Sequence, residues 1–249
     1  MESRPSVARP FYSTFADLYD HVVTDPVGPW TEAVEGALAS RGVERGTLLD
    51  AGCGTGRHAA AFAALGHRVT LLDASAELLA VASTRCPGAP AHLGDVRDPH
   101  LPGSFDVLTC RGVLNDLLGD ADRDAAVRSS ARLLRPGGML ALDVRDVGRS
   151  RERTDDTPRS TTVHRDTGSA VTFTHRSRWE DGLLVVAEEH RERSPDGSVD
   201  VQEFTFRMRP WTEQEVHERL GRAGFADVVT GPGVGGRWDR LFVTAVRRA

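Results

Sequence analysis

The sequence predicts an α/β protein whose parallel sheet carries an inserted antiparallel β meander. Two observations lead to this prediction. Between residues 47 and 146, short apolar segments alternate with helical segments, which is the pattern of βαβ units in a parallel sheet. Between residues 160 and 210, apolar residues alternate with a period of two, and turn residues separate the runs.

The parallel part is read in chain order. Residues 11–41 are expected to form a helical entry segment, because apolar residues recur there at helical spacing. A first strand starts at residue 47 and leads through a glycine-rich turn into an alanine-rich helix ending near residue 66. The helix at 120–138 has acids at its start, arginines toward its end and a Pro-Gly-Gly stop, as capping and the helix dipole favour. Further strands are expected at 68–75, 89–95, 104–112 and 139–146, with another helix at 76–86.

The pattern changes after residue 146. Residues 147–160 are charged and polar, which predicts a loop. Three or four antiparallel strands follow, separated by Asp-Gly and Pro-Asp-Gly turn residues. Thr212 and Glu215 then form a capping box that begins a helix, and two strands joined by a glycine-rich loop at 231–236 close the sequence.

Composition narrows the classes of function. The 249 residues are 39% hydrophobic and 27% charged, as in ordinary globular domains. A net charge of −5 offers no basic surface for nucleic acid, and no apolar run is long enough to span a membrane. The N-terminal segment lacks the apolar core of a signal peptide, which predicts a cytoplasmic protein. The cysteines Cys53, Cys86 and Cys110 are widely spaced, so we expect neither a disulfide framework nor a metal site.

Residue usage is biased. All 31 basic residues are arginines, and Asn115 is the only asparagine. Such a bias is typical of a GC-rich genome. The absence of lysine excludes mechanisms built on a lysine Schiff base or on a P-loop lysine.

The strongest functional signal is DAGCGTG at 50–56, where a strand ends and a helix begins. Glycines let the backbone turn tightly and approach a ligand, and ligands of open α/β sheets bind at the carboxyl ends of strands. The next strand ends in Asp73, which can accept hydrogen bonds from ribose hydroxyls. Asp95 ends the third strand, where it can accept a hydrogen bond from an adenine amino group.

A nicotinamide dinucleotide is the alternative ligand. Its fingerprint is GxGxxG, with a pyrophosphate at the helix N-terminus. Here the glycines fall as GxGxG, Arg57 stands at the position of the last glycine, and Asp50 would repel a pyrophosphate. These features favour a cofactor with a nucleoside and no phosphate, such as S-adenosylmethionine, with Asp50 facing its ammonium group or organising the loop.

The ordered set of DAGCGTG, Asp73, Gly94-Asp95, SFDVLTCRG and LRPGG resembles the class I S-adenosylmethionine-dependent methyltransferases. The architecture resembles their small-molecule branch, which includes aminosugar and glycine-type N-methyltransferases. The resemblance implies a Rossmann-like sheet of seven strands with an antiparallel last strand. It also implies a single domain over 1–249, made of a helical cap (1–45), a cofactor-binding core (47–146), a β insertion roofing the acceptor pocket (160–210) and a return to the core (211–249).

The resemblance also implies which residues hold the cofactor. The glycine loop lines the methionine part, Asp73 holds the ribose, Leu78 lies against the adenine, and Arg111 contributes backbone near the sulfonium. Tyr19 and Trp30 are expected to close over the cofactor, where aromatic rings attract the sulfonium, although both also suit a helical core. The implied set is Tyr19, Trp30, Ala51, Gly52, Gly54, Gly56, Arg57, Asp73, Ala74, Leu78, Asp95, Val96 and Arg111.

Asn115 and Asp116 are the catalytic candidates, because they follow the fourth strand, whose carboxyl end faces the cofactor methyl in this family. Both side chains can accept a hydrogen bond from an acceptor amine and orient its lone pair. A helix N-cap is the alternative role for the pair.

The expected partner is a small-molecule acceptor, with no nucleic acid and no membrane, and the protein is expected to be a monomer or a homodimer. An amine nitrogen is favoured, since it needs only to be neutral when it attacks. An O-methyltransferase and a non-methylating S-adenosylmethionine-binding protein are the alternatives. The apolar wall of the pocket is expected from Phe204, Phe206 and Met208, or from Val171 and Phe173.

Overall fold

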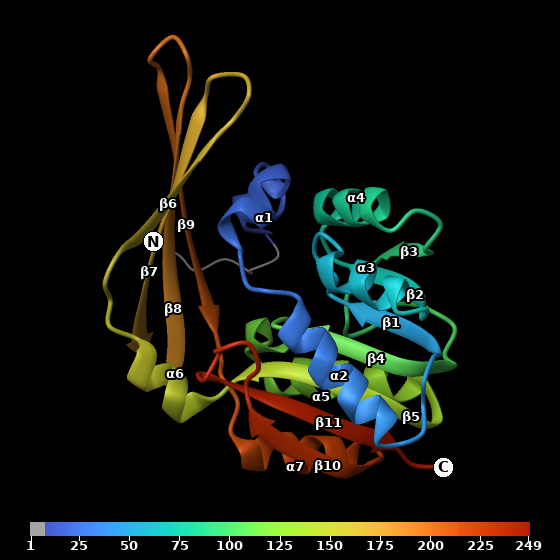
Figure 1. Ribbon diagram of the computed structural model, residues 1–249. Helices are drawn as coiled ribbons and strands as arrows, with labels where there is room; N and C mark the ends of the chain where they lie inside the picture. The colour runs from blue at the N-terminus through green and yellow to red at the C-terminus, as the bar shows by residue number, and fades with distance from the viewer. Residues whose placement is uncertain (1–7) are drawn as a thin grey trace.

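A seven-stranded sheet forms the centre of the computed structural model, which describes residues 8–249 (Figure 1). Its strands lie in the order β10-β11-β5-β4-β1-β2-β3. The neighbours among β1 to β5 are parallel, whereas β11 is antiparallel to both β5 and β10. The predicted seven-stranded sheet with an antiparallel last strand is therefore confirmed. The strands are β1 (Thr47–Ala51), β2 (Arg68–Asp73), β3 (Ala91–Leu93), β4 (Phe105–Arg111), β5 (Leu134–Arg145), β10 (Phe225–Pro232) and β11 (Arg240–Arg247).

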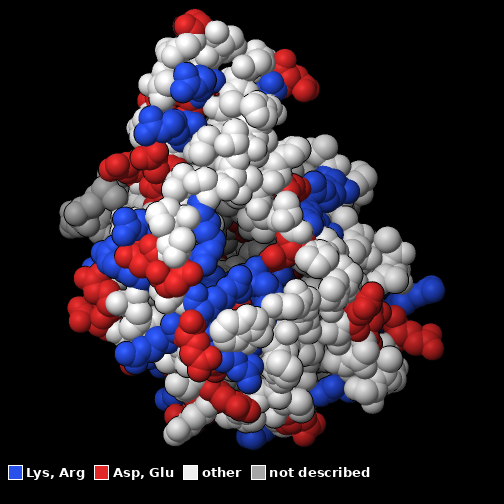
Figure 2. All heavy atoms as spheres, turned by 60° about the vertical axis from the view of Figure 1, so that its left-hand side comes forward, with Lys and Arg blue, Asp and Glu red and all other residues white. Residues whose placement is uncertain are grey.

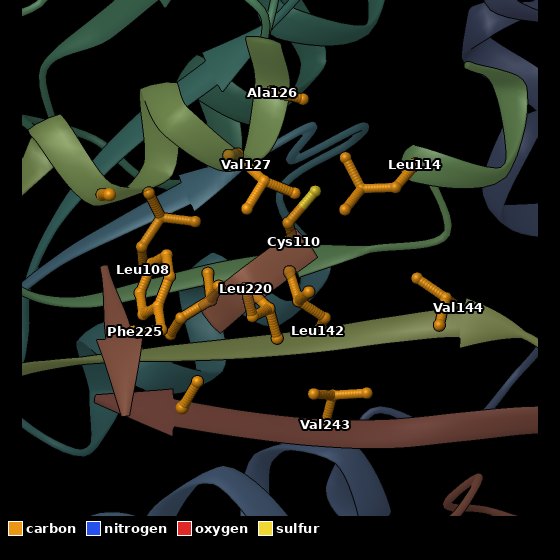
Figure 3. Close-up of a cluster of buried hydrophobic side chains, with 14 of the residues drawn as sticks. Leu108, Cys110, Leu114, Ala126, Val127, Leu142, Val144, Leu220, Phe225 and Val243 are labelled. Carbon is orange, nitrogen blue, oxygen red and sulfur yellow. The ribbon is translucent and has the colours of Figure 1, made fainter. Parts of the chain in front are cut away.

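Each face of this sheet has its own apolar cluster beneath helices. One cluster packs Leu108 and Leu142 of the sheet with Val127 of α5 and Leu220 of α7 (Figure 3). The other joins β1 and β2 to α2, α3 and α4, and includes the fully buried Phe62. No helix within residues 8–249 has the length and apolar character needed to cross a membrane. The helices are α2 (Gly28–Ala39), α3 (Arg57–Ala64), α4 (Ala76–Arg85), α5 (Asp120–Leu133) and α7 (Glu213–Arg222).

A second sheet of four antiparallel strands stands beside the first, on the left of Figure 1. The chain enters it after β5 through α6 (Val147–Arg153) and leaves it toward α7, so the predicted inserted meander is confirmed. Its strands are β6 (Arg159–His164), β7 (Ala170–Glu180), β8 (Leu183–Arg193) and β9 (Val199–Met208), paired in that order.

The N-terminal segment lies between the second sheet and α4 (Figure 1). Phe11 and Phe15 meet the ring of Phe173 on β7 edge-on, with centroids 5.4 and 5.5 Å apart. Residues 1–7 of the predicted cap lie outside the described residues. The short helices of this segment are η2 (Pro10–Tyr12), η3 (Ala16–Leu18) and α1 (Tyr19–Val22).

Three predicted boundaries are wrong. The helix predicted to reach residue 138 ends at Leu133, because Leu134 already pairs with Phe105 and the Pro-Gly-Gly segment lies inside β5. The predicted loop at 147–160 begins with α6, which the Asp146 side chain caps by accepting a hydrogen bond from Arg149 N at 2.8 Å. β3 ends at Leu93, so the loop beyond the strand carries Asp95.

Candidate active site

The glycine loop after β1 holds the carboxylate that ends β2. Gly52 has a φ of +74°, and a Cβ there would lie 2.2 Å from Val113 Cγ2, so only glycine fits. Gly54 N donates to Asp73 Oδ2 at 2.7 Å, and Ser75 N donates to Asp73 Oδ1 at 2.9 Å. The backbone of two loops therefore fixes the Asp73 carboxylate at the carboxyl edge of the sheet.

Asp50 and Asp73 place two carboxylates at this edge. Asp50 is buried and accepts a hydrogen bond from Thr109 Oγ1 at 2.8 Å, and burial raises its pKa to about 6. Burial also raises the pKa of Asp73, against the lowering effect of its backbone donors. Neither carboxylate forms an ion pair with another residue of the 8–249 segment. A cationic ligand with ribose hydroxyls fits this pair, and S-adenosylmethionine has both features.

The first described residues cross over these loops; we call residues 8–27 the N-terminal strap. Asp20 accepts hydrogen bonds from Thr55 Oγ1 at 2.7 Å and from Arg85 at 2.6 Å. The Ser75 hydroxyl donates to the carbonyl of Tyr12 at 2.6 Å. The strap is thus bonded to the loops after β1 and β2, which carry the cofactor residues predicted from the sequence.

Arg57, predicted to bind the cofactor, holds the strap instead. Its guanidinium donates to the carbonyls of Val23 at 2.6 Å and Asp25 at 2.8 Å. Its hydrogen bonds therefore go to the strap backbone, and this geometry supports a structural role at the mouth of the site.

The two predicted aromatic residues have different surroundings. Tyr19 stacks on Phe11 with ring centroids 5.0 Å apart, and burial raises its pKa, with Asp73 close enough to add to that effect. Trp30 is 1% exposed, belongs to the cluster under β1 and meets Phe242 edge-on at 5.5 Å. The geometry therefore favours the core alternative for Trp30 and a place beside the cofactor loop for Tyr19.

The residues predicted to meet the adenine and methionine lie around the ends of β1, β2 and β3. Leu78 is buried, and its N–H donates to the Ser75 hydroxyl that caps α4. Asp95 is half exposed and its carboxylate is paired with Arg97 at 2.6 Å, so it is already committed to a partner. Of the others, Ala51 is buried at the end of β1, and Gly56 is the N-cap of α3, with a φ of +76°. Ala74 is exposed, and Val96 packs against the cluster under α5.

The geometry favours a structural role for Asn115, which was predicted to bind the acceptor. It is fully buried in η4 (Leu114–Asp116). Its Nδ2 donates to the carbonyl of Gly112 at 3.0 Å, and its Oδ1 accepts from Arg145 N at 2.7 Å. The amide therefore joins the end of β4 to the end of β5, and the predicted helix N-cap is also not formed, since no side chain caps η4.

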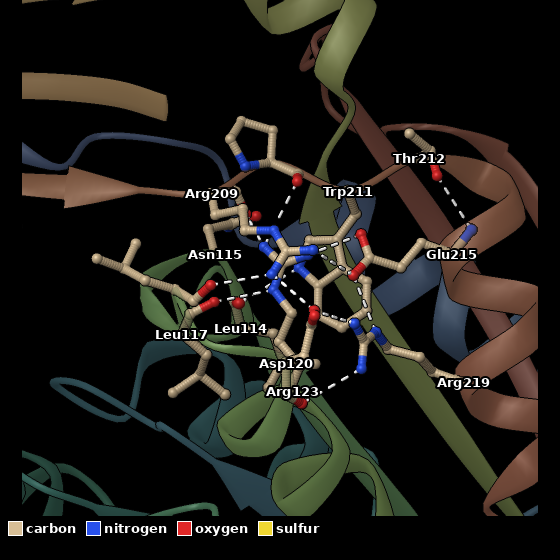
Figure 4. Close-up of polar contacts among 12 residues, drawn as sticks. Leu114, Asn115, Leu117, Asp120, Arg123, Arg209, Trp211, Thr212, Glu215 and Arg219 are labelled. Carbon is tan, nitrogen blue, oxygen red and sulfur yellow. Dashed lines mark hydrogen bonds and ion pairs between the residues drawn. The ribbon is translucent and has the colours of Figure 1, made fainter. Parts of the chain in front are cut away.

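A buried arginine that the sequence analysis missed clamps the same segment (Figure 4). Arg123 of α5 is 0% exposed, donates to Leu117 O at 2.8 Å and pairs with Glu215 at 2.9 Å. Its guanidinium lies 4.0 Å from the ring centroid of Trp211, whose Nε1 donates to Leu114 O at 3.3 Å. These contacts fix the 114–118 segment. The sequence offered only its high arginine content as a signal for such a contact, and composition alone does not identify Arg123 among 31 arginines.

Asp116 ends η4, which contacts β9 of the second sheet. Burial raises the pKa of Tyr12, and the charge of Asp116 adds to that effect. Burial lowers the pKa of Arg9, but Tyr12 and Glu188 raise it overall, and Asp116 adds to their effect. Arg9 donates to Tyr12 Oη at 2.6 Å and to Glu188 Oε2 on β8 at 3.1 Å. Strap, second sheet and η4 therefore meet around one polar site, and Figure 2 shows a hollow lined by charged side chains on this face.

The apolar residues predicted to wall the pocket fall into two clusters. Val171 and Phe173 pack with Phe11 and Phe15 of the strap. Phe206 is buried in the other cluster, and its ring lies 4.4 Å from the Arg9 guanidinium. Arg9 therefore connects the two clusters beneath the second sheet.

Comparisons with known proteins agree with this geometry. Residues 49–142 match the family model described as a methyltransferase domain. A dTDP-4-amino-2,3,4,6-tetradeoxy-D-glucose N,N-dimethyltransferase of Saccharopolyspora spinosa is 36% identical over 133 residues, which cover 51% of this chain and 53% of that protein. A dTDP-3-amino-3,6-dideoxy-alpha-D-glucopyranose N,N-dimethyltransferase of Streptomyces fradiae is 38% identical over 98 residues, 39% of this chain and 38% of that protein. The chain thus spans about half the length, or less, of these curated relatives.

Solved structures extend the likeness to nearly the whole fold. The sugar N-methyltransferase KedS8 from Streptoalloteichus superposes with a TM-score of 0.82 at 23% identity, covering 94% of this chain and 92% of that one. The amino pentose methyltransferase CalS10 from Micromonospora echinaspora, solved with bound S-adenosylmethionine, has a TM-score of 0.69 at 27% identity, covering 94% and 96%.

Residues 49–142 match a methyltransferase domain, and the fold around them is similar to that of S-adenosylmethionine-dependent methyltransferases. These comparisons support the class predicted from the glycine motif, and they support S-adenosylmethionine as the cofactor. The matched residues 49–142 contain the ends of β1, β2 and β4, where the predicted site lies.

Proposed function

We propose that this chain transfers the methyl group of S-adenosylmethionine to an amine nitrogen of a small-molecule acceptor, such as an amino sugar of a natural product. The observation that carries the proposal is the meeting of three parts: the Asp50–Asp73 carboxylates, the clamped η4 segment with Asp116, and the second sheet above them. The amino-sugar dimethyltransferases among the relatives support the nitrogen acceptor.

The bound cofactor supplies a methyl carbon that its sulfonium has already activated. In this proposal Asp73 accepts hydrogen bonds from the ribose hydroxyls, and Asp50 faces the ammonium group. The strap and the second sheet cover the site and exclude water. Asp116 accepts a hydrogen bond from the acceptor amine and directs its lone pair. Orientation of this kind can contribute about 7–11 kcal/mol to the barrier reduction.

Three ionisable groups around the acceptor side, Glu188, Tyr12 and Tyr19, are poorly suited to activate a hydroxyl acceptor. A hydroxyl must lose its proton during attack, which calls for a base titrating near neutral pH. Burial opposes ionisation of Glu188, but Arg9 outweighs burial and lowers its pKa to about 2, so Glu188 is a weak base. Burial raises the pKa of both Tyr12 and Tyr19, which keeps their hydroxyls protonated.

O-methylation remains the second candidate. A ubiquinone biosynthesis O-methyltransferase of Xanthomonas campestris is 38% identical over 101 residues, which cover 38% of this chain. That match supports a shared cofactor-binding core. It covers too little of the chain to distinguish a nitrogen acceptor from an oxygen acceptor. A protein that binds S-adenosylmethionine without methylating is the third candidate.

Two measurements test the proposal. Calorimetry is expected to show binding of S-adenosylhomocysteine and no binding of NADH; binding of NADH alone would refute the cofactor assignment. Mass spectrometry of reactions with amino sugars, free and nucleotide-linked, is then compared with the matching hydroxyl compounds. Methylated amines support the proposal, methylated hydroxyls support the second candidate, and cofactor binding without any S-adenosylhomocysteine formation supports the third.

The remaining features of the proposed enzyme follow from this chemistry. We place it in the cytoplasm, where S-adenosylmethionine is made, with a small molecule as its acceptor and with no nucleic-acid or membrane partner. Analytical ultracentrifugation tests the expectation of a monomer or a homodimer.

A further inference from the structure

A second polar cluster lies where β4 and β5 end and β11 begins. Its residues come from six parts of the chain: the strap, the ends of β4 and β5, α6, the loop before β11 and the start of β11. We call it the arginine cluster. Its members are Asp25, Arg111, Asp143, Arg145, Arg153, Arg237, Asp239 and Arg240.

The carboxylates of this cluster do not balance its guanidinium groups. Five arginines share three aspartates, which leaves two positive charges without a carboxylate in the cluster. Asp239 is fully buried and pairs with Arg145 at 2.6 Å and Arg153 at 2.5 Å. The other pairs are Asp25 with Arg111 at 3.3 Å and with Arg237, and Asp143 with Arg240. Arg237 Nε also lies 3.8 Å from Asp239 Oδ1, within ion-pair range but beyond hydrogen-bond distance.

Donors in the cluster are also left over. The Nε atoms of Arg111, Arg145, Arg237 and Arg240 are buried and have no hydrogen-bond partner among the described residues. Buried donors without partners cost free energy, so a ligand that supplies acceptors is favoured there. The four side chains remain 11–20% exposed, so they are not sealed from solvent. Burial lowers the pKa of Arg145 to about 10, and repulsion from Arg240, Arg237 and Arg153 adds to that shift.

The arginine cluster adjoins the proposed site of methyl transfer. The backbone N–H of Arg145 donates to the Asn115 side chain, and Asn115 immediately precedes Asp116 in the sequence. On the other side, the charge of Arg111 acts on both Asp50 and Tyr19 beside the glycine loop. Basic side chains are gathered around the hollow in Figure 2.

We propose that the arginine cluster binds an oxyanion carried by the acceptor, either a phosphate or a carboxylate. Guanidinium groups bind both oxyanions through paired N–H donors in a planar fork, and two uncompensated charges match a dianionic group. This inference rests on the proposed function for its link to the acceptor, while the anion site itself rests on the cluster alone. The acceptor would then carry its anion on one side and its amine toward Asp116.

Calorimetry on the full chain saturated with S-adenosylhomocysteine tests the anion site without any turnover. Inorganic pyrophosphate is the phosphate probe and succinate is the carboxylate probe. Arg145→Gln and Arg237→Gln each remove one cluster guanidinium. Arg176→Gln is the matched control, because Arg176 is an exposed arginine of β7, outside the arginine cluster, and also pairs with an aspartate, Asp156. Circular dichroism checks that each variant is folded.

We expect at least one probe to bind the natural chain, and both cluster variants to bind it at least tenfold more weakly, while Arg176→Gln binds it normally. The probe that binds identifies the kind of oxyanion. Absence of binding by both probes overturns the inference, and so does equal weakening in Arg176→Gln. If only one variant folds, that variant decides.

A kinetic measurement then separates this inference from the proposed function. With any acceptor that is methylated, the binding probe should raise the KM of the acceptor and leave the KM of the cofactor unchanged. If no acceptor is methylated while the probe still binds through Arg145 and Arg237, the proposed function fails and the anion site stands. If an acceptor is methylated and the probe does not compete with it, the link between the cluster and the acceptor fails.

Discussion

The cofactor side and the acceptor side of this site are built in different ways. On the cofactor side, Asp73 is held by backbone N–H groups 2 and 19 residues away, and Gly52 shapes the loop by its own backbone. On the acceptor side, the contacts are ion pairs between distant segments. Arg9 meets Glu188 across 179 residues, and Arg145 meets Asp239 across 94. The first construction depends on backbone shape, and the second on the completed fold.

The difference has an energetic consequence. Backbone donors in a glycine loop persist when a distant side chain changes. Removing one partner of a buried ion pair destabilises the fold strongly, because the other charge stays buried without its partner. Substitutions on the acceptor side should therefore disturb stability and acceptor use together, and those on the cofactor side should affect mainly cofactor affinity.

Arg123→Met should have the largest effect. The substitution keeps much of the side-chain volume but removes the guanidinium that pairs with Glu215 and donates to the carbonyl of Leu117. Breaking a buried pair costs about 3–5 kcal/mol, and the lower end is expected because Glu215 keeps Arg209 and Arg219. Urea unfolding measures this loss, with exposed Arg128→Met on the same helix as the control. Equal stability of the two variants would contradict the clamp.

Asp116→Ala should lower turnover by roughly 10²-fold or more, with cofactor affinity nearly unchanged. The reason is that a hydrogen bond which directs the acceptor lone pair is lost, while the glycine loop is intact. Asn115→Ala is the comparison: it should lower stability by about 1–3 kcal/mol, since the backbone N–H of Arg145 and the carbonyl of Gly112 lose their partner. Normal turnover in Asp116→Ala would remove this residue from the site.

Asp73→Ala should weaken S-adenosylhomocysteine binding by roughly 10–150-fold, because a charge-assisted hydrogen bond contributes about 1.5–3 kcal/mol. Asp95→Ala is the control on the neighbouring loop. Its carboxylate is half exposed and already paired with Arg97, so a smaller loss is expected. Calorimetry on both variants measures the difference. Equal losses would mean that Asp95 leaves Arg97 to bind the cofactor.

The same difference explains what the sequence could predict. DAGCGTG and Asp73 are local signals, because the motif itself specifies the tight turn and the strand end. The alternation of strands and helices likewise predicted the parallel sheet, and the period-two segments predicted the antiparallel meander. Trp30 was harder to place, since an aromatic residue on an entry helix suits a core and a ligand equally well, and only its contact with Phe242 decides.

The acceptor side could not be predicted for a physical reason. Among 31 basic residues that are all arginines, no local pattern marks Arg9, Arg123 or Arg145 as buried. Their partners are set by how β8, α7 and the loop before β11 pack against η4 and the strap. The predicted helix end at residue 138 was wrong for a related reason. Pairing of β5 with β4 begins at Leu134, so the helix ends before the Pro-Gly-Gly segment, which lies inside the strand.

The pH dependence of cofactor binding should be the smallest effect and the sharpest test of the cofactor side. Burial raises the pKa of Asp50 to about 6 in the cofactor-free protein, above the value of about 3.9 for an unfolded chain. The carboxyl must lose its proton to face an ammonium group, so affinity for S-adenosylhomocysteine should rise about tenfold from pH 5 to pH 7 and then level off.

The cofactor-free protein should show the opposite trend in stability. A raised pKa in the folded state stabilises it while Asp50 is protonated, and that contribution is lost as the pH rises through about 4 to 6. Asp50→Asn should remove both trends, as calorimetric titrations and urea unfolding between pH 4.5 and 8 would show. An unchanged pH dependence of affinity in Asp50→Asn would assign the titration to another group, of which Asp73 is the nearest, and would leave Asp50 with the loop-organising role alone.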